Sequence, residues 1–164
     1  MATPSRLTVG RAGTGYLLRV LGRGTMRESP AAHEFASRVL DNGGGPLYVA
    51  LDQCDYLDST FLGALVDLHR HHGRCDPPRF SIAATSATRA RLLGPNHLVG
   101  LLRAVEEVPS VIGEEVELPT GARDSRDLGQ HVMECHRRLA ELDGPNRLAF
   151  ERIADQMARE LVNH

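Results

Sequence analysis

The sequence predicts an α/β fold, in which short apolar strands alternate with amphipathic helices. Residues 46–51, PLYVAL, form a continuous apolar run, which is typical of a strand covered on both faces of a sheet. Helical periodicity precedes and follows this run, and an apolar hairpin stands near the start of the chain. Strands separated by helices pair in parallel through crossover connections, so we expect a mixed sheet of about four to five strands with helices packed on it.

The segment before the central run supplies the hairpin and a helix. Residues 7–11 and 15–21 are apolar runs separated by Ala-Gly-Thr-Gly, the composition of a tight turn. Ser29 and Pro30 then predict a helix start, with Ser as the N-cap and Pro at the first helical position. Asn and Gly at 42–45 end this helix, whose apolar residues recur at helical spacing: Ala32, Phe35, Ala36, Val39 and Leu40.

The segment after the central run continues the alternation. Residues 52–56 are expected to form a short polar connection, and a second helix is expected from Asp58 to about His72, because Phe61, Leu65, Leu68 and His72 follow helical spacing. Residues 80–84, FSIAA, predict another strand, and Ser86 can cap a third helix. Residues 101–108 supply the last expected strand.

The final part of the chain has a different pattern, in which two helical stripes follow each other without an apolar strand between them. Residues 119–164 predict a helical hairpin appended to an α/β domain of residues 1–118, with a turn at Gly144-Pro145. Its two apolar stripes are Leu128, Val132, Cys135, Leu139 and Leu142, then Phe150, Ile153, Met157 and Leu161. Exposed stripes are unfavourable, so the helices should pack on each other and then on the domain or on a second copy. Self-association, an added partner site and a simple packing extension all remain open.

Composition argues against several classes of protein. The chain of 164 residues has a formal net charge of -2, contains no lysine and has only 4% aromatic residues, so we expect no binding to nucleic acid. No apolar run reaches the length of a membrane helix, and the N-terminus lacks the apolar core of a signal peptide. The three cysteines are widely spaced, which favours free thiols. A cytoplasmic protein without membrane insertion is expected.

Two clusters invite a cofactor interpretation. The cluster from His69 to Cys75 (HRHHGRC) is one candidate zinc site, but zinc sites usually carry tighter paired spacings, and cations at a helix end are favoured by the macrodipole. The glycines at residues 10–15 lie between two strands of a hairpin, where they make a turn instead of a phosphate-binding loop. We therefore expect no metal and no other cofactor, with the metal site kept as the least favoured alternative.

Asp58, Ser59 and Thr60 stand between an apolar strand and an apolar helix, and three roles are open to them. They can cap the helix, because their side chains accept hydrogen bonds from backbone N–H groups at a helix start. A nucleophile elbow would need a glycine two residues to either side of Ser59, and LDSTF has neither. The third role is a switch that other proteins modify. No catalytic residue is predicted, and the protein is expected not to be an enzyme.

Residues 46–70, PLYVALDQCDYLDSTFLGALVDLHR, resemble the core of STAS domains, the family of bacterial anti-sigma factor antagonists and of modules attached to sulfate transporters. In that family an apolar strand leads through a short polar segment into Asp-Ser-[Ser/Thr]-Gly-[Leu/Ile]-Gly at a helix start. Asp58, Ser59, Thr60, Leu62 and Gly63 occupy those positions, and Phe61 replaces the first glycine. The resemblance covers roughly residues 5–112 and does not extend to the helical hairpin.

The resemblance implies a regulatory module for signal transduction and transcription regulation. In family members that act as switches, a partner serine/threonine kinase phosphorylates the second hydroxyl, which corresponds to Thr60, with Ser59 beside it. The implied partners are such a kinase or an anti-sigma factor, docked through Asp58, Phe61, Leu62 and Gly63. A constitutive scaffold or accessory subunit, with Phe61 packed into a partner and Thr60 only a cap, is the alternative.

Overall fold

The computed structural model describes residues 4–121, 123–142 and 147–162, and within them it confirms the α/β class. A mixed sheet has seven strands: β1 (Arg6–Ala12), β2 (Gly15–Gly24), β3 (Leu47–Ala50), β4 (Cys54–Leu57), β5 (Phe80–Ala83), β6 (Ala104–Val105) and β7 (Ile112–Leu118). Five α-helices accompany it: α1 (Ser29–Asp41), α2 (Ser59–Leu68), α3 (Ser86–Leu93), α4 (Ser125–Ala140) and α5 (Arg147–Val162). A π-helical turn, His69–Gly73, continues α2, and a short 3-10 turn, Gly94–Asn96, follows α3.

The strand order is β6-β5-β3-β2-β1-β7, and β4 pairs with the end of β2. The expected hairpin is present: β1 and β2 are antiparallel, with Ala12 opposite Gly15 and a left-handed Gly13 (φ 59°) in the turn. The central strand β3 pairs in parallel with β2 on one side and β5 on the other. All four of its residues are buried or half-buried, as a strand covered on both faces should be.

Two strands lie outside the expected set, which explains the larger sheet. Residues 52–56 were expected to form a polar connection, but residues 54–57 form β4, which pairs in parallel with residues 22–24 of β2 with a register shift between Gly22 and Arg23. β7 is an edge strand with mostly exposed side chains, so it carries no apolar pattern to reveal it. Its position is set by pairing with β1 and by Glu115, which accepts hydrogen bonds from Thr8 and Arg19 at 3.0 and 2.9 Å.

The first helix starts one residue earlier than the Ser29 cap predicts. Glu28 is the N-cap residue and Ser29 is the first helical residue. The Glu28 carboxylate turns back to accept hydrogen bonds from the backbone N–H and the hydroxyl of Thr25, at 3.1 and 2.9 Å. The loop between β2 and α1 is therefore closed by its own side chains, and the Ser29 hydroxyl is left for a contact elsewhere in the fold.

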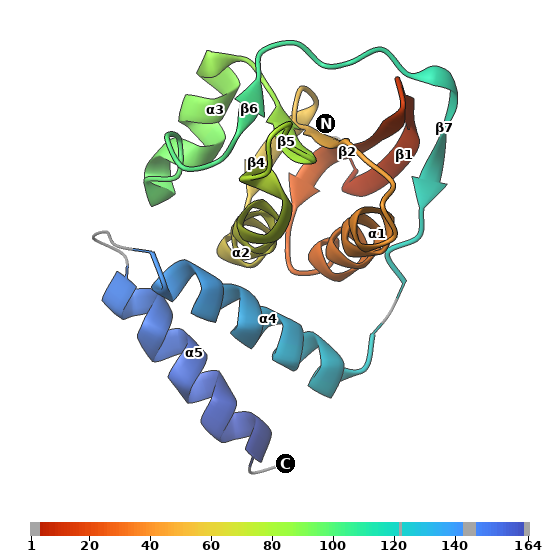
Figure 1. Ribbon diagram of the computed structural model, residues 1–164. Helices are drawn as coiled ribbons and strands as arrows, with labels where there is room; N and C mark the ends of the chain where they lie inside the picture. Colours follow the sequence, from red (N-terminus) through yellow and green to blue (C-terminus); the bar gives the residue numbers. More distant parts are fainter. Residues whose placement is uncertain (1–3, 122, 143–146, 163–164) are drawn as a thin grey trace.

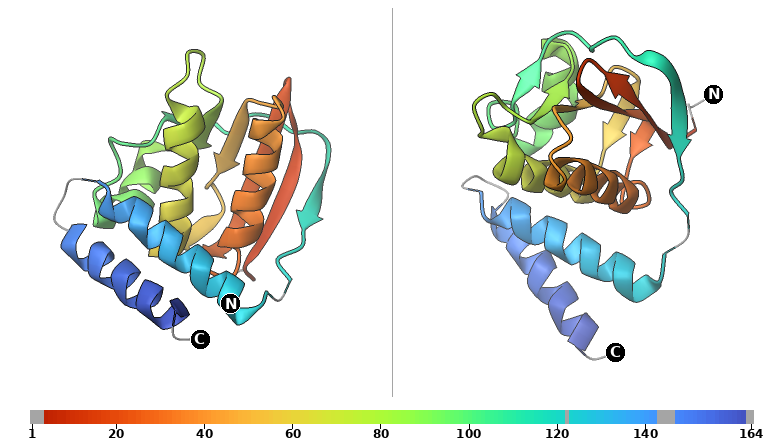
Figure 2. Two further views of the ribbon diagram at one scale, coloured as in Figure 1. Left: turned by 60° about the horizontal axis from the view of Figure 1, so that its bottom comes forward. Right: turned by 45° about the vertical axis from the view of Figure 1, so that its right-hand side comes forward.

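The elements form four successive layers (Figure 1). Helices α1 and α2 lie side by side on one face of the sheet, α4 crosses both of them, and α5 lies outside α4 (Figure 2). The main core fills the space between the sheet and the first two helices, with Leu18, Val49, Leu65 and Ile82 among its fully buried members. On the opposite face a smaller cluster joins Ala12, Leu17 and Ala50 to Val108 and Val111.

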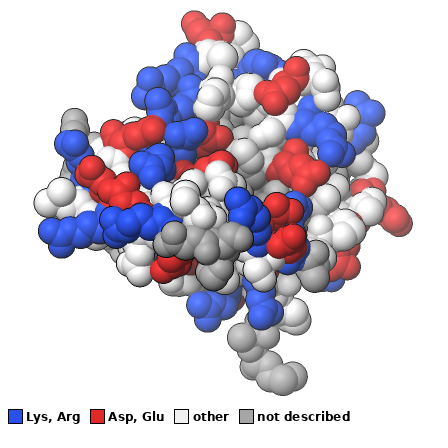
Figure 3. All heavy atoms as spheres, turned by 90° about the horizontal axis from the view of Figure 1, so that it is seen from below, with Lys and Arg blue, Asp and Glu red and all other residues white. Residues whose placement is uncertain are grey.

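The C-terminal helices form the expected antiparallel pair. Gly129 of α4 lies against Leu161 of α5, and at the other end the ring of His136 lies 5.9 Å from that of Phe150. The turn expected at Gly144-Pro145 falls outside the described residues. In the described ranges, no helix combines the length and the apolar character needed to cross a bilayer. Seen from the side of this pair, arginine and acidic side chains are interspersed, so neither sign of charge dominates the face (Figure 3).

Candidate functional site

The start of α2 is tied to the end of β2, and this places the Asp58-Ser59-Thr60 segment. The backbone N–H of Asp58 donates to the carbonyl of Gly24 at 2.9 Å, directly after β4. Gly24 leaves room for this approach, since a Cβ there would lie 2.6 Å from the side chain of Leu57 and 3.1 Å from that of Phe61. The strand β4 thus places the start of α2 against the loop that leads into α1.

Asp58 is the N-cap of α2, as predicted. Its carboxylate accepts one hydrogen bond from the backbone N–H of Phe61 and a second from that of Met26, both at 2.8 Å. The first bond satisfies an otherwise unpaired donor of the helix. The second reaches across to the β2–α1 loop, so one carboxylate holds two segments together.

The side chains that follow Asp58 differ sharply in exposure. Ser59 is half-buried, whereas Thr60, Phe61 and Leu62 are 3%, 1% and 0% exposed. Phe61 and Leu62 belong to the main core, so in this structure neither presents its side chain to a partner as the resemblance implied. The reason is that the helix turns these residues toward the sheet. Thr60 as a phosphoacceptor stays a prediction, and its hydroxyl is covered here.

Helix α4 covers the other side of α2, and Ser59 contacts it directly. The Ser59 hydroxyl lies 2.9 Å from Nε2 of His136, whose Nδ1 lies 2.8 Å from the carbonyl oxygen of Val132. A carbonyl can only accept, so Nδ1 carries a proton, and when this is the only proton on the ring, Nε2 accepts a hydrogen bond from the Ser59 hydroxyl. A carbonyl at Nδ1, in place of a carboxylate, distinguishes this pair from the triad of serine hydrolases.

Gly63 is the point of closest approach between α2 and α4. A Cβ on Gly63 would lie 2.3 Å from the carbonyl oxygen and 2.7 Å from the Cβ of Cys135. Only a glycine leaves room for the α4 backbone at this distance. The position that the resemblance assigns to partner binding is therefore occupied by this chain's own helix.

Asp67, one turn further along α2, joins three helices. Its carboxylate contacts Nε2 of His33 on α1 at 2.7 Å and Nε of Arg138 on α4 at 2.9 Å. Burial alone would raise the pKa of Asp67, but the hydrogen bonds from His33 and Arg138 outweigh it and lower the pKa to about 2. The carboxylate is therefore charged wherever α4 is docked at neutral pH.

A third polar contact joins α1 to α4. The Ser29 hydroxyl lies 2.8 Å from Nε2 of His131, which also lies 3.5 Å from the Sγ of Cys135. Burial, aided by the nearby His33, lowers the pKa of His131 to about 4, and burial raises the pKa of the Cys135 thiol to about 12. Both side chains are therefore neutral at pH 7 in the docked state.

The cluster from His69 to Cys75 does not converge. His69 is buried against Gly73, Nε2 of His72 faces Asp41 at 3.3 Å, and Nδ1 of His71 turns back to the carbonyl oxygen of Asp67 at 2.8 Å. Cys75 is exposed. Within the described residues, no three His, Cys, Asp or Glu side chains lie close enough together to hold a metal ion. Nothing in their geometry favours the metal alternative.

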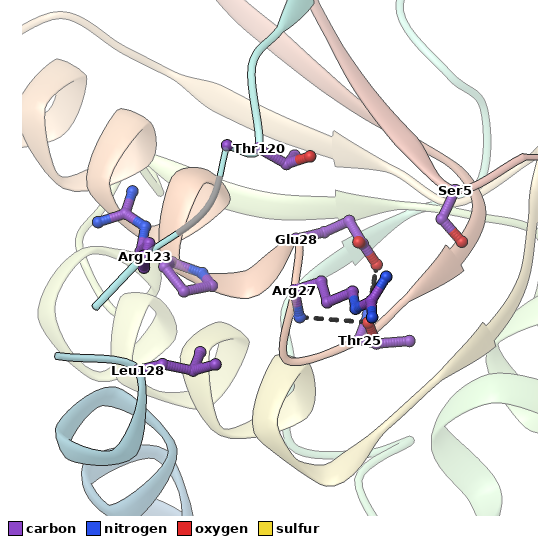
Figure 4. A pocket seen from close by; sticks show the side chains of 9 residues that line it. Ser5, Thr25, Arg27, Glu28, Thr120, Arg123 and Leu128 are labelled. Atoms are coloured by element: carbon purple, nitrogen blue, oxygen red, sulfur yellow. Dashed lines mark hydrogen bonds between the residues drawn. The ribbon is translucent and has the colours of Figure 1, made fainter. Parts of the chain in front are cut away.

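Two hollows flank the start of α1 and α2. The larger, of about 820 Å³, lies between the β2–α1 loop and the segment that leads to α4. Arg27 and Arg123 line it from opposite sides, and their guanidinium groups point apart (Figure 4). Arg123 is paired with Glu34 at 3.0 Å, so the two cations do not form one anion site. The smaller hollow, of about 330 Å³, is lined by Ser59, Asp58, Arg91 and neighbouring residues.

Sequence reasoning placed Asp58, Ser59 and Gly63 correctly at a helix start but missed the α4 residues that meet Ser59, Gly63 and Asp67. His131, His136 and Arg138 come from the segment outside the resemblance. One signal was available: Ser59, Gly63 and Asp67 recur every four residues, so they share one face of α2 that is small and polar. No protein-family model matches the chain, and no curated protein matches it.

Replacing Asp58 by alanine should destabilise the protein, because the N–H groups of Phe61 and Met26 both lose their acceptor. We expect a loss of about 1–2 kcal/mol in the free energy of unfolding, measured by urea denaturation. Asp58→Asn, which keeps one acceptor oxygen, should lose about half as much. An alanine variant as stable as the parent protein would show that the bridge contributes nothing.

Replacing Gly63 by alanine tests the close approach of α4. In an isolated helix this change is favourable by about 1 kcal/mol, but here the methyl group meets the backbone of Cys135, and we expect a net destabilisation of about 1–3 kcal/mol. Gly94→Ala is the matched control, since a Cβ at Gly94 meets nothing within 4 Å. Equal thermal midpoints for the two variants would contradict the contact.

The lowered pKa of His131 makes stability depend on pH. Between pH 6.5 and about pH 4, His131 is protonated in the unfolded chain but not in the folded chain. The free energy of unfolding should therefore decrease as the pH is lowered across this range. The depressed pKa of Asp67 acts lower, between pH 3.8 and about 2. Between pH 7 and pH 5, the free energy of unfolding should change less for His131→Gln than for the parent protein, as measured by urea denaturation at both pH values.

Proposed function

We propose that this protein is a non-enzymatic regulatory module of the STAS type, similar to anti-sigma factor antagonists. Its partner would be a serine/threonine kinase or an anti-sigma factor, docked around the start of α2. The proposal rests on the Asp58-Ser59-Thr60 motif and on one observation about its setting. Ser59, the first residue of α2, lines a hollow of about 330 Å³ on one side and contacts α4 on the other.

The exposure of the two hydroxyls refines the proposed switch. The resemblance assigns the phosphate to Thr60, which is 3% exposed, whereas Ser59 is half-buried and borders the hollow. A kinase reaching this segment as it stands meets Ser59 first. Transfer to Thr60 requires the helix start to move, so Ser59 is the better candidate in the arrangement described.

A phosphate at Ser59 would act through local electrostatics. It adds a charge of about -1.5 to -2 at a helix N-terminus, where the backbone N–H groups and the macrodipole favour an anion. It would also take the place of the hydroxyl that contacts His136, and it would bring negative charge near the Asp58 carboxylate. Both effects act on the docking of α4 and on any partner at this surface, while the core beneath stays as it is.

A constitutive scaffold or accessory subunit is the second candidate, and the burial of Thr60 favours it. In that case Asp58 and Ser59 serve only to cap α2 and to hold α4. The scaffold hypothesis drawn from the sequence placed Phe61 against a partner, but Phe61 is 1% exposed and packs in the core. A scaffold would therefore use other surfaces, such as the outer face of the C-terminal helices.

Phosphorylation provides the test. The protein is incubated with candidate kinases and ATP, and the modified residue is mapped by mass spectrometry. We expect phosphate on Ser59 or Thr60 and its loss in Ser59→Ala or Thr60→Ala. Ser86→Ala is the matched control, because Ser86 is the exposed first residue of α3 and should not matter.

A binding measurement complements the mapping. Partner binding to Ser59→Asp should weaken by more than a hundredfold, which corresponds to a loss of about 3 kcal/mol. Phosphate on neither Ser59 nor Thr60, or binding that survives Ser59→Asp, would remove the switch and leave the scaffold.

A further inference from the structure

The surface of α1 and α2 beneath α4 has an unusual composition for a buried surface. Its members on α2 are Ser59, Gly63 and Asp67, and those on α1 are Ser29 and His33. We call this set the covered face. It contains hydroxyls, an imidazole, a carboxylate and a glycine, whereas the opposite side of α2 carries the large apolar residues of the core. A surface of this kind tolerates water.

Polar contacts join α4 to the covered face at three places. The Ser29–His131 and Ser59–His136 hydrogen bonds and the Asp67–Arg138 ion pair span it. Apolar contact comes from Leu139, which is 2% exposed and joins the main core, and from Leu142 and Phe150, which pack against that core. The interface between α4 and the covered face, which we call the seam, also contains a small, partly open hollow of about 70 Å³. Such a seam opens at a lower free energy than a close-packed core does.

The chain allows α4 to leave together with α5. Residues 119–121 and 123–124, between β7 and α4, belong to neither helix nor strand. In Figures 1 and 2 this connection runs outside the layers, and α5 lies on the side of α4 that faces away from the α/β unit. The two helices can therefore move as a pair without breaking a strand pairing of the sheet.

We propose that the covered face is the binding surface for a helix of the partner protein, and that α4 occupies it in the partner's absence. This rests on the proposed function, since it names the surface and the kind of partner that the regulatory module would use. The partner helix and α4 compete for the same groups. Docking of the partner exposes α4, and docking of α4 covers the side of Ser59 that contacts His136.

The contacts of α4 specify the chemistry of the partner helix. It carries side chains able to hydrogen-bond where His131 and His136 meet the two serine hydroxyls. It carries a cation seven residues after the first acceptor, where Arg138 meets Asp67. Its backbone approaches Gly63 closely, so the residue that takes the place of Cys135 is small. The anionic Asp67 gives the covered face a preference for a basic helix over an acidic one.

The three cysteines provide a measure of α4 release in the full chain. Cys135 lies in the seam and is 5% exposed, Cys54 lies in the core and is 1% exposed, and Cys75 is exposed. Only the thiolate reacts, so a docked Cys135 is protected both by burial and by its raised pKa. Cys54 becomes reactive on unfolding of the core. Cys135 should become reactive whenever α4 lifts.

The experiment is pulsed labelling with N-ethylmaleimide, read at each cysteine by mass spectrometry. In the native protein we expect Cys135 to react more slowly than Cys75 and faster than Cys54. Arg138→Ala should speed the labelling of Cys135 roughly tenfold, because the ion pair to Asp67 is lost, and should leave Cys54 unchanged. Arg137→Ala is the matched control, since Arg137 faces Asp155 on α5.

A synthetic peptide of residues 123–142 serves as the probe for a helix bound in trans. It should bind the Arg138→Ala protein at least about tenfold more tightly than the native protein, whose own α4 competes better. The same peptide with the substitution Arg138→Glu should not bind. Sedimentation of the native and Arg138→Ala proteins tests whether a second copy of this chain, which donates its own α4, occupies the covered face instead.

Two results would overturn the proposal. If Cys135 and Cys54 are always labelled together, α4 leaves only when the whole protein unfolds. If the opened protein forms dimers by exchanging α4, the covered face is for a second copy and not for another protein. Failure of the kinase experiment leaves the labelling result intact, so the two proposals can fail separately.

Discussion

Helix α2 is covered on two opposite sides, and most of the structure follows from this constraint. One side carries Phe61, Leu62 and Leu65 into the core against the sheet, and the other carries Ser59, Gly63 and Asp67 to α4. The two sides of α2 must therefore differ in chemistry if one side is to stay buried against the sheet while the other can be exposed to water when α4 leaves. The large apolar residues keep the first side buried, because exposing them to water costs free energy.

The Asp58 carboxylate fixes where this helix begins. It holds the N–H of Phe61 and that of Met26, so the start of α2 and the β2–α1 loop form one unit. Ser59 then lies at a defined place between a hollow and α4. A hydroxyl held in this way suits a site where a small chemical change alters which helix is docked, which is the physical basis of the regulatory role proposed above.

Several parts of the fold were predictable from sequence because their cause is local. Short-range turn chemistry around Gly13 indicated the hairpin, and the acid before Ser59 indicated the cap. Periodicity and capping residues indicated the three helices of the sheet domain and the C-terminal helical hairpin in outline. β4 and β7 were not predictable in the same way. Their residues lack an apolar alternation, and their strand geometry comes from partners distant in the sequence, β2 and β1.

The features of the candidate site likewise divide into those with a local cause and those set by distant residues. The sequence alone determined that Asp58 caps a helix, that Ser59 and Thr60 stand at its start, and that the apolar stripe from Leu128 to Leu142 belongs to an amphipathic helix, since each depends on neighbours within a few positions. Only the tertiary structure decided that Thr60 and Phe61 face inward, and that His131, His136 and Arg138 meet Ser29, Ser59 and Asp67. These pairings join residues about seventy to one hundred positions apart, and periodicity shows which face of a helix is buried without naming what covers it.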